Sequence, residues 1–486
     1  MEKVMKMYIN TNLYLNLIQC PRLFLHNLQK QKKPYIDGTL RHQIHEYIQY
    51  EYSIKDLEIE DAFNHTIDAV NHHHNFGDGL FLYKDCYTVI DALKYTEEGY
   101  ELYFVRGGTK LRKEFKYIAA YSYYLLNKLG IKVSHIYMCT INNQYVKYGK
   151  VDPRLLFNFN DVTLDVMDLQ DETKKNIHTA LSLLEADEVN VEISTSCLKG
   201  IGCSNKDECF NNLPTPNIFD IVELEKNKAF EYYQNNIITY QDVLDHKLPL
   251  TLHQTMQIES YVYHKDPIMN IKRLNYFFKQ LKYPLYFLDF ETFQIPVPLY
   301  DGTKPYESIP FQYSLHILEE NGSLKHLEFL ADGNNDPRHE LAKSLVNNIP
   351  SDACIIAYNN HLEKTVVMSL AILFEDTRDH LLNMYPHIYD LEIPFKNYDY
   401  YHKDTHGNHS IKTILPALCP NDPSLDYHYL EGVHNGSEAM FTYTKLKYLN
   451  EKEKEETRKN LLKYCELDTL AMVKIYQRIM NDLNNI

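Results

Sequence analysis

The sequence predicts an α/β protein in which two strand-containing domains are joined by a helical connector. Short runs of β-branched and aromatic residues alternate with segments whose apolar residues recur every three or four positions. A chain of 486 residues is also too long for one ordinary hydrophobic core. A polar, cysteine-bearing loop closed by Pro214 and Pro216 indicates a boundary. We therefore predict domains at 1–212 and 282–486, with the connector at 213–281.

The amino-terminal domain is predicted to begin with helices and to continue as a ββαβ run, which is typical of a mixed α/β sheet. The predicted helices lie at 7–30, 39–53, 111–129 and 161–186, and the predicted strands lie at 86–93, 100–105 and 131–140. The connector is helical throughout by the same pattern.

The carboxyl-terminal domain begins with strands and then alternates strand and helix, an order consistent with a ribonuclease-H-like sheet. The predicted strands lie at 284–291, 311–318, 325–330 and 353–358, and the predicted helices lie at 338–347, 361–373 and 451–480.

Composition favours a globular protein of the cytoplasm with no membrane partner. No stretch approaches the ~20 uninterrupted apolar residues of a membrane span, and the first residues lack the layout of a signal peptide. Nine cysteines, an odd number, argue against a disulfide scaffold. The formal charge of −16 is unusual for a protein that binds nucleic acid. Nucleases, however, concentrate acidic residues at a metal site and basic residues along the local surface that binds the nucleic acid.

Two acids lie at the end of the first carboxyl-terminal strand. Asp289 and Glu291 are two residues apart, so a strand projects both from the same face. Carboxylates this close repel each other unless a cation lies between them. The alternative is a strand end that reaches solvent.

Two helices supply further candidates. Glu363 lies four residues after Asn359, which can cap the helix that follows the 353–358 strand. Tyr464 and Asp468 share one face of the last helix because they are also four apart. Alternatively, Glu363 is an ordinary first-turn acid favoured by the helix dipole, and Tyr464 is the edge of a core.

The order of these segments resembles the DEDD exonuclease superfamily in its tyrosine-bearing subclass (DEDDy). That resemblance implies a 3′–5′ exonuclease acting on DNA or RNA, in which Asp289, Glu291, Glu363 and Asp468 hold two Mg²⁺ or Mn²⁺ ions. It also implies that Tyr464 orients the attacking water. Hard cations of this kind prefer oxygen ligands, which fits the residue types. One departure is Glu363, because the superfamily usually has aspartate there.

Four cysteines form a second candidate set. Cys197, Cys203 and Cys209 follow one another in a polar loop, and Cys20 lies far upstream. Four thiolates can close an iron–sulfur cluster of the [4Fe–4S] kind, and zinc is the alternative, since the spacing does not distinguish them. Unrelated free thiols are uncommon in such a loop.

The amino-terminal domain resembles RecB-type nucleases of the PD-(D/E)XK fold that are stabilised by an iron–sulfur cluster. The resemblance rests on Cys20, on the Gly38-x₃-His42 motif, on Asp91 in a strand and on the cysteine triplet. It implies a nuclease site at the strand pair, with Asp91 in the first position.

The second strand of that pair departs from the pattern. Phe104 and Arg106 stand where the family has an acid and a lysine, and Glu101 is out of register. We therefore predict a degenerate site in which His42 is structural, and a domain that binds nucleic acid without cutting it. An active endonuclease that uses Glu101 is the alternative.

Basic residues near both sites are candidate phosphate contacts. They comprise the run Arg106, Lys110, Arg112, Lys113 and Lys116, and the pair Ser410 and Lys412. A solvated helix face and a simple cap at Ser410 are the alternatives.

Nearly the whole chain resembles a bacterial family that carries only a domain-of-unknown-function label and combines these two nuclease folds. The motifs that carry this resemblance are Gly149-Lys-Val-Asp-Pro153, Ile309–His316, Asp336-Pro-Arg338 and Ser410-Ile-Lys412. The expected partner is nucleic acid, as a single strand or a 3′ end. The alternative function is a catalytically inactive binding or scaffold protein built from both folds.

Overall fold

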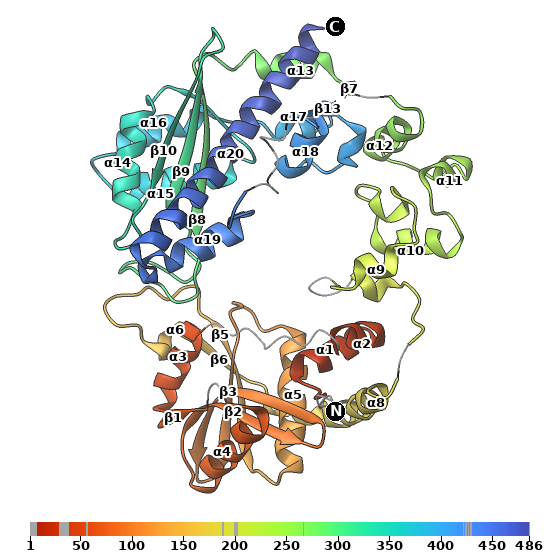
Figure 1. The fold of residues 1–486 in the computed structure, drawn as a ribbon, viewed down its shortest axis with the longest axis vertical. Coiled ribbons are helices and arrows are strands. Elements are labelled where there is room, and N and C mark those ends of the chain that lie inside the picture. The colour runs from red at the N-terminus through yellow and green to blue at the C-terminus, as the bar shows by residue number, and fades with distance from the viewer. Residues whose placement is uncertain are drawn as a thin grey trace. The chain divides into compact units, whose positions relative to one another are not determined.

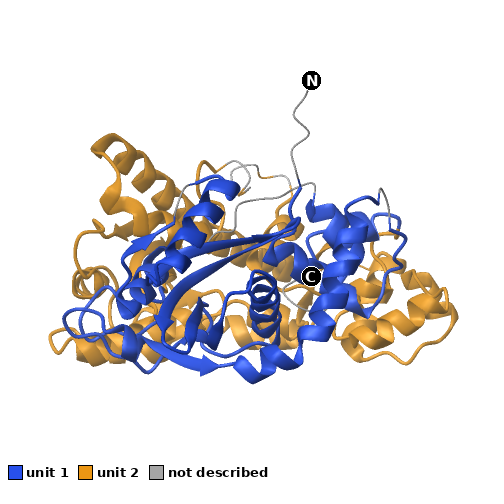
Figure 2. Ribbon diagram, turned by 90° about the horizontal axis from the view of Figure 1, so that it is seen from below, with its two compact units in different colours: residues 1–212, 295–306 blue, residues 213–294, 307–486 orange. Residues whose placement is uncertain are grey.

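The computed structural model confirms the predicted α/β class and divides the chain into two compact units. It describes residues 7–28, 38–54, 57–186, 189–198, 203–265, 267–420, 422, 425, 427 and 430–485. The first unit comprises residues 1–212 and 295–306, and the second comprises 213–294 and 307–486 (Figure 2). The helical segment after residue 212 therefore groups with the second unit.

The first unit is built on a six-stranded sheet with the order β1-β2-β3-β4-β5-β6. Its strands are β1 (Tyr52–Ser53), β2 (Phe76–Tyr83), β3 (Cys86–Thr96), β4 (Gly99–Val105), β5 (Val133–Ile141) and β6 (Phe157–Asp161). Its helices are α1 (Thr11–Gln19), α2 (Pro21–Leu28), α3 (Gly38–Ile48), α4 (Ile59–Asn71), α5 (Lys113–Lys128), α6 (Pro153–Leu156), α7 (Thr163–Asp168), α8 (Gln170–Leu183), η1 (Thr195–Leu198) and α9 (Lys206–Phe210).

Two helices predicted in this unit end earlier than their apolar pattern indicates. Cys20 is extended because a residue that precedes a proline avoids the helical region, so α1 and α2 are separate helices. Gln49 adopts a positive φ of 53° directly after α3, and the chain then pairs as β1 with β2. Strand β2 was not predicted, because its glycines and its burial on both faces hide the alternating pattern.

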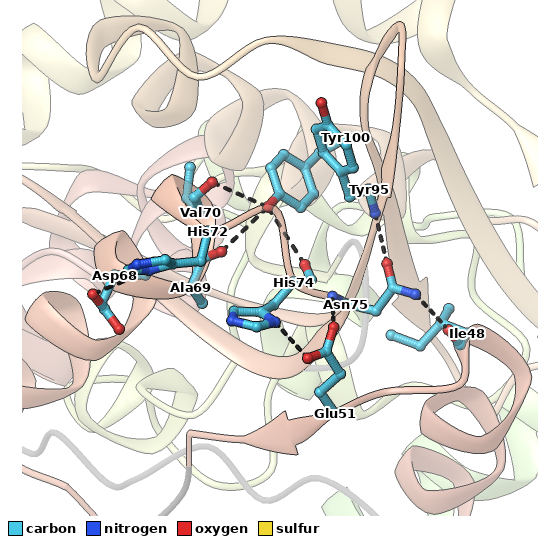
Figure 3. A network of polar contacts seen from close by, with 10 residues as sticks. All are labelled: Ile48, Glu51, Asp68, Ala69, Val70, His72, His74, Asn75, Tyr95 and Tyr100. Carbon is cyan, nitrogen blue, oxygen red and sulfur yellow. Dashed lines mark hydrogen bonds and ion pairs between the residues drawn. The ribbon is translucent and has the colours of Figure 1, made fainter.

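A network of polar contacts closes the corner between α4 and the sheet (Figure 3). The Tyr100 hydroxyl lies 3.4 Å from the carbonyl oxygens of Val70 and His74. His74 pairs with Glu51, and the Asn75 amide donates to the carbonyl of Ile48 at 3.1 Å. The polar groups of this turn are therefore engaged in contacts within the protein.

The second unit is built on a five-stranded sheet with the order β10-β9-β8-β11-β12 (Figure 1). Strands β8 (Leu285–Phe293), β9 (Ile309–Leu318) and β10 (Leu324–Leu330) are antiparallel neighbours, whereas β11 (Cys354–Ala357) and β12 (Ile388–Asp390) run parallel to β8. The helices of this domain are α14 (Arg338–Asn348), α15 (His361–Leu373), α16 (Arg378–Met384), η3 (Tyr385–His387), α17 (Ile393–Lys396), η4 (Lys403–Thr405), α18 (Ile411–Leu418), α19 (Gly436–Lys445), η7 (Leu446–Tyr448) and α20 (Glu451–Asn484).

Helices cover both faces of this sheet, and the alternation along β8 divides its side chains between them. Phe287 packs in a core with residues of α18 and α20 such as Leu415 and Leu467, whereas Leu288 and Phe290 pack with α14 and α15. The odd-numbered residues of β8 therefore point toward α20, and Asp289 and Glu291 share that direction.

The segment before β8 is mostly helical rather than helical throughout, because the short strand β7 interrupts it, and it has a small core of its own. Its elements are η2 (Ile218–Asp220), α10 (Lys226–Gln234), α11 (Tyr240–Asp245), α12 (Leu252–Val262), β7 (Ile268–Met269) and α13 (Ile271–Phe278), and β7 pairs with β13 (Tyr400–Tyr401). Within the described residues no helix combines the length and the apolar content that crossing a bilayer requires.

The loop between β8 and β9 belongs to the first unit, where it docks by polar contacts. Lys147 Nζ lies 2.5 Å from an Asp301 carboxylate oxygen, and the Gly149 amide donates to the same oxygen at 3.1 Å. The Lys147 amide donates to the carbonyl of Thr303. Pro296 and Tyr306 complete the wall of a pocket of about 450 Å³ that also contains Asp91 and Arg106.

Candidate functional site

Three carboxylates from β8 and α20 converge in the second unit. Oxygen atoms of Asp289, Glu291 and Asp468 all lie within 4.8 Å of one another, although 176 residues separate Asp289 from the neighbouring Cys465 of α20. Among the described residues, this is the group of acidic, histidine or cysteine side chains whose geometry suits one metal ion. The structure therefore brings together the two acids of the strand and the acid of the last helix.

Glu363, in the first turn of α15, completes the acidic set. Its side chain is only 3% exposed, and its buried Oε2 atom has no hydrogen-bond partner. After burial and the charge of Asp468, its charge also raises the pKa values of Asp289 and Glu291, although its oxygens lie outside the group that converges within 4.8 Å. Asn360, rather than Asn359, precedes the helix. Asn359 instead takes a positive φ of 57° and turns the chain between β11 and α15.

The four acids are held where charge is costly. Removal from water is the first cause that raises the pKa of Glu291 and of Glu363 to about 8, and that of Asp468 to about 6. Removal from water, followed by the charges of Asp468, Glu291 and Glu363, raises the pKa of Asp289 well above its usual range. A divalent cation would relieve both costs.

Two tyrosines lie against Asp468. Tyr464 is buried one turn earlier on α20, and the hydroxyl of Tyr427 donates to Asp468 Oδ1 at 2.5 Å. The two rings have centroids 6.2 Å apart. Burial, followed by the Asp468 charge, raises the pKa of each phenol, so both hydroxyls stay protonated. Tyr427 was not predicted, because the sequence around it has no helical or strand periodicity.

Lys412, in the first turn of α18, supplies positive charge to the site. Its Nζ atom lies 5.0 Å from the ring centroid of Tyr427 and 5.4 Å from that of Tyr464. It donates to the carbonyl of His434 at 3.0 Å. Its charge lowers the pKa values of Glu291 and Asp468, opposing the effect of burial. Ser410 occupies the cap position of α18, although its side chain makes no capping hydrogen bond.

The donor set of this site suits a hard divalent cation. All of its candidate ligand atoms are carboxylate oxygens, which Mg²⁺ and Mn²⁺ prefer. The unpartnered Oε2 of Glu363 provides a further acceptor.

The four predicted cysteines also lie near one another, in the first unit. All are free thiols, and the charges of Cys20, Cys197 and Cys203 each contribute to the raised pKa of Cys209, after the larger effects of burial and of opposing Arg22. The Asn205 amide donates to Cys209 Sγ at 3.6 Å.

Contacts of α2 with α9 and with the loop before α9 bring the ends of this set together. His26 pairs with Glu208 at 3.1 Å, and the Asn27 amide donates to Ser204 Oγ at 3.4 Å. Among the described residues, no three of these sulfur atoms lie within 4.8 Å of one another.

The predicted amino-terminal site holds carboxylates that are already paired. Asp91 Oδ2 accepts hydrogen bonds from the Val105 amide at 2.8 Å and from Arg106 NH1 at 3.1 Å. Asp78, on β2, pairs with Arg41 NH1 at 2.7 Å, and Arg41 Nε lies 3.7 Å from Asp91 Oδ1. Two buried acids are therefore matched by two guanidinium groups.

His42 lies outside this network. Its side chain is 58% exposed and pairs with Glu46 at 3.5 Å. The buried histidine is His45, whose Nε2 lies 2.8 Å from the carbonyl oxygen of Asp91. Glu101 accepts a hydrogen bond from Tyr103 at 2.7 Å and also lies near Lys94. Arg41, Asp78 and His45 were not predicted, because Asp78 lies on the strand that the sequence did not reveal.

The comparisons with known proteins bear on the strand that carries the first two acids. Residues 286–410 match the family described as a domain of unknown function, DUF2779. The match takes in Asp289, Glu291, Glu363 and Ser410 and confirms the expected domain-of-unknown-function label for that segment. No curated protein and no solved structure matches the chain.

Proposed function

We propose that the protein is a metal-dependent 3′–5′ exonuclease whose active site is the acidic cluster of the second unit. The observation that carries this proposal is the convergence of Asp289, Glu291 and Asp468 within 4.8 Å. Glu363 lies beside them with an unpartnered buried oxygen. Glu291, Glu363 and Asp468 are buried and Asp289 is half-buried. Like charges held in this way without paired cations are costly, so the site needs a function for them.

The topology of the second unit supports a ribonuclease-H-like fold. Counted along the chain within this sheet, the strand order is 3-2-1-4-5, with the first three strands antiparallel and the last two parallel to the first. The first and central strand, β8, carries Asp289 and Glu291.

The chain's own residues would divide the work at a phosphodiester. Asp289, Glu291, Glu363 and Asp468 would hold two Mg²⁺ or Mn²⁺ ions, which when bound supply an activated water and stabilise the leaving oxygen. Tyr464 is a protonated hydroxyl held near Asp468, where it can orient a water molecule.

Lys412 would contact a phosphate oxygen of the substrate. Its ammonium lies over the two tyrosine rings and beside the acids, so it can attract an anion without neutralising the whole cluster.

In the first unit, we propose that Cys20, Cys197, Cys203 and Cys209 hold a [4Fe–4S] cluster. A single zinc ion at ~2.3 Å from each sulfur brings the sulfurs closer together than a cluster does. The proximity of the four thiols supports one shared metal site, and zinc is the alternative that the metal content tests. Protein purified without oxygen should be brown and contain acid-labile sulfide, and Cys203→Ser should bleach it. Stoichiometric zinc in colourless protein would overturn this part.

The exonuclease assignment is tested with 5′-labelled DNA and RNA oligonucleotides in the presence and absence of Mn²⁺. The unaltered protein should shorten one or both in single-nucleotide steps, and Asp289→Ala should abolish the shortening. Asp352→Ala, which removes an exposed acid of the same unit, is the matched control. Equal activity in Asp289→Ala would reject the assignment.

A catalytically inactive nucleic-acid-binding protein is the second candidate. The observation that favours it is the first unit, where the buried acids Asp78 and Asp91 are both paired with arginine side chains. Binding of oligonucleotides without degradation under any divalent cation would support this candidate.

A further inference from the structure

Helix α19 begins at the acidic cluster and leads away from it. A Cβ atom at Gly436, its first residue, would lie 3.5 Å from Glu291 Oε2. Asn435 caps the helix by accepting a hydrogen bond from the Glu438 amide at 3.0 Å. The Gln294 amide at the end of β8 donates to Met440 Sδ at 3.3 Å. The start of α19 is therefore positioned directly beside the candidate catalytic carboxylates.

The aromatic residues of α19 and η7 divide between the core and the surface. Tyr443 is buried and stacks on Phe311, with ring centroids 4.0 Å apart. Phe441 remains 45% exposed and Tyr448 remains 76% exposed. Packing therefore explains Tyr443 but gives no reason for the two exposed rings. Phe441 lies roughly 7.5 Å along the helix axis from Gly436, at 1.5 Å per residue.

Each exposed ring has a lysine beside it. Lys445 Nζ lies 3.7 Å from the ring centroid of Phe441, and Lys447 Nζ lies 4.9 Å from that of Tyr448. A flat apolar surface next to a positive charge matches the repeating unit of a single strand, in which each base is joined to a phosphate.

Two of the acids at the start of α20 are engaged locally. Glu453 accepts a hydrogen bond from the Asn450 amide as part of a capping box, and Glu455 pairs with Lys459 at 3.2 Å. Neither of these two acids pairs with Lys445 or Lys447.

We propose that Phe441, Lys445, Lys447 and Tyr448 form a stacking platform for single-stranded nucleic acid next to the acidic cluster. The placement of the strand rests on the proposed exonuclease function, since its 3′ end would lie at Glu291. Stacking on an exposed ring requires an unpaired base, so the platform selects single strands over duplexes. It would hold the nucleotides that precede the 3′ end.

Binding to the full chain tests the platform separately from cleavage. The probes are a fluorescein-labelled oligothymidylate and a blunt duplex of equal length, titrated by anisotropy with Ca²⁺ in place of Mn²⁺. Phe441→Ala and Tyr448→Ala should each weaken binding of the single strand by about tenfold and leave weak duplex binding unchanged. Tyr276→Ala is the matched control, because Tyr276 is also 76% exposed in the same unit.

A second measurement separates failure of the platform from failure of the proposed function. Hydrolysis of thymidine 5′-monophosphate p-nitrophenyl ester with Mn²⁺ reports on the carboxylates and needs no neighbouring base. Phe441→Ala and Tyr448→Ala should leave this hydrolysis unchanged. If the unaltered protein hydrolyses no ester, and both variants bind the single strand more weakly than the unaltered protein does, the platform stands and the exonuclease function fails. Strand binding within twofold of normal in both variants, or no strand binding by the unaltered protein, overturns the platform.

Discussion

Both units have buried carboxylates on central strands. In the first unit arginine side chains pair with these carboxylates, whereas in the second unit like charges converge. In the first unit, Asp78 and Asp91 are matched by Arg41 and Arg106 through contacts of 2.7 to 3.7 Å. In the second unit, three acids converge within 4.8 Å and a fourth lies beside them, while Lys412 keeps its ammonium over two tyrosine rings. Carboxylates alone therefore do not define a metal site. The number of cations already paired with them distinguishes the two.

The largest expected difference is in activity. Asp468→Asn should lower oligonucleotide hydrolysis by about a thousandfold, because it removes a metal ligand that three other acids cannot replace. Asp91→Asn, at the neutralised site, should leave hydrolysis within twofold of normal. Initial rates with Mn²⁺ measure both. A loss of activity in Asp91→Asn alone would reverse the assignment of the two sites.

The next effect is on stability and concerns the first unit. Arg41→Met should lower the free energy of unfolding by about 3 kcal/mol, because it leaves Asp78 buried without its partner. Adding Asp78→Asn should restore part of the loss, since the unpaired charge disappears. Calorimetry on the single and double variants measures the difference. No loss in Arg41→Met would show that the pair contributes nothing to the fold.

The stability of the metal-free protein should depend on pH because of the acids of the second unit. With pKa values of about 8, folded Glu291 and Glu363 retain protons that an unfolded chain releases near pH ~4.3. The metal-free protein therefore loses stability as the pH rises from about 5 to about 8.

Binding of Mn²⁺ should oppose this loss and raise Tm by about 5 °C at pH 8, at a concentration about 100-fold above Kd. Thermal melts at pH 6 and pH 8, with and without Mn²⁺, provide the test. Glu291→Gln should reduce both the pH dependence and the response to Mn²⁺. A pH dependence equal to that of the unaltered protein would argue against a raised pKa at Glu291.

The smallest effect expected is at Tyr427. Tyr427→Phe removes the hydrogen bond to Asp468 Oδ1 and should lower the rate by about tenfold, because that carboxylate is then less well oriented. The apparent affinity for oligonucleotide should not change. Rates over a range of substrate concentrations separate these quantities. A rise in KM with no change in kcat would make Tyr427 a substrate contact instead.

The sequence was most informative where a regular element carries the residues. The spacing within β8 and within α20 follows from strand and helix geometry, so Asp289, Glu291 and Asp468 could be named in advance. Their convergence could not be derived from spacing, because it depends on how α20 packs on the sheet.

Residues outside a clear periodic pattern were not predicted for a related reason. The sequence around Tyr427 has no periodicity, and Asp78 lies on a strand whose glycines and two-sided burial hide its alternation. Arg41 and His45 were overlooked on a predicted helix, because the pattern shows which face is buried but not which polar groups meet there.

The loop between β8 and β9 has a consequence for how the chain is made. Because residues 295–306 complete the first unit, that unit cannot be finished when Asn212 leaves the ribosome. It must wait for the intervening segment and β8, which at roughly 5–20 residues per second takes on the order of 5–20 s. During that interval Lys147 lacks Asp301, and the pocket around Asp91 lacks Pro296 and Tyr306. A gene fragment that ends at Asn212 would make this unfinished state permanent.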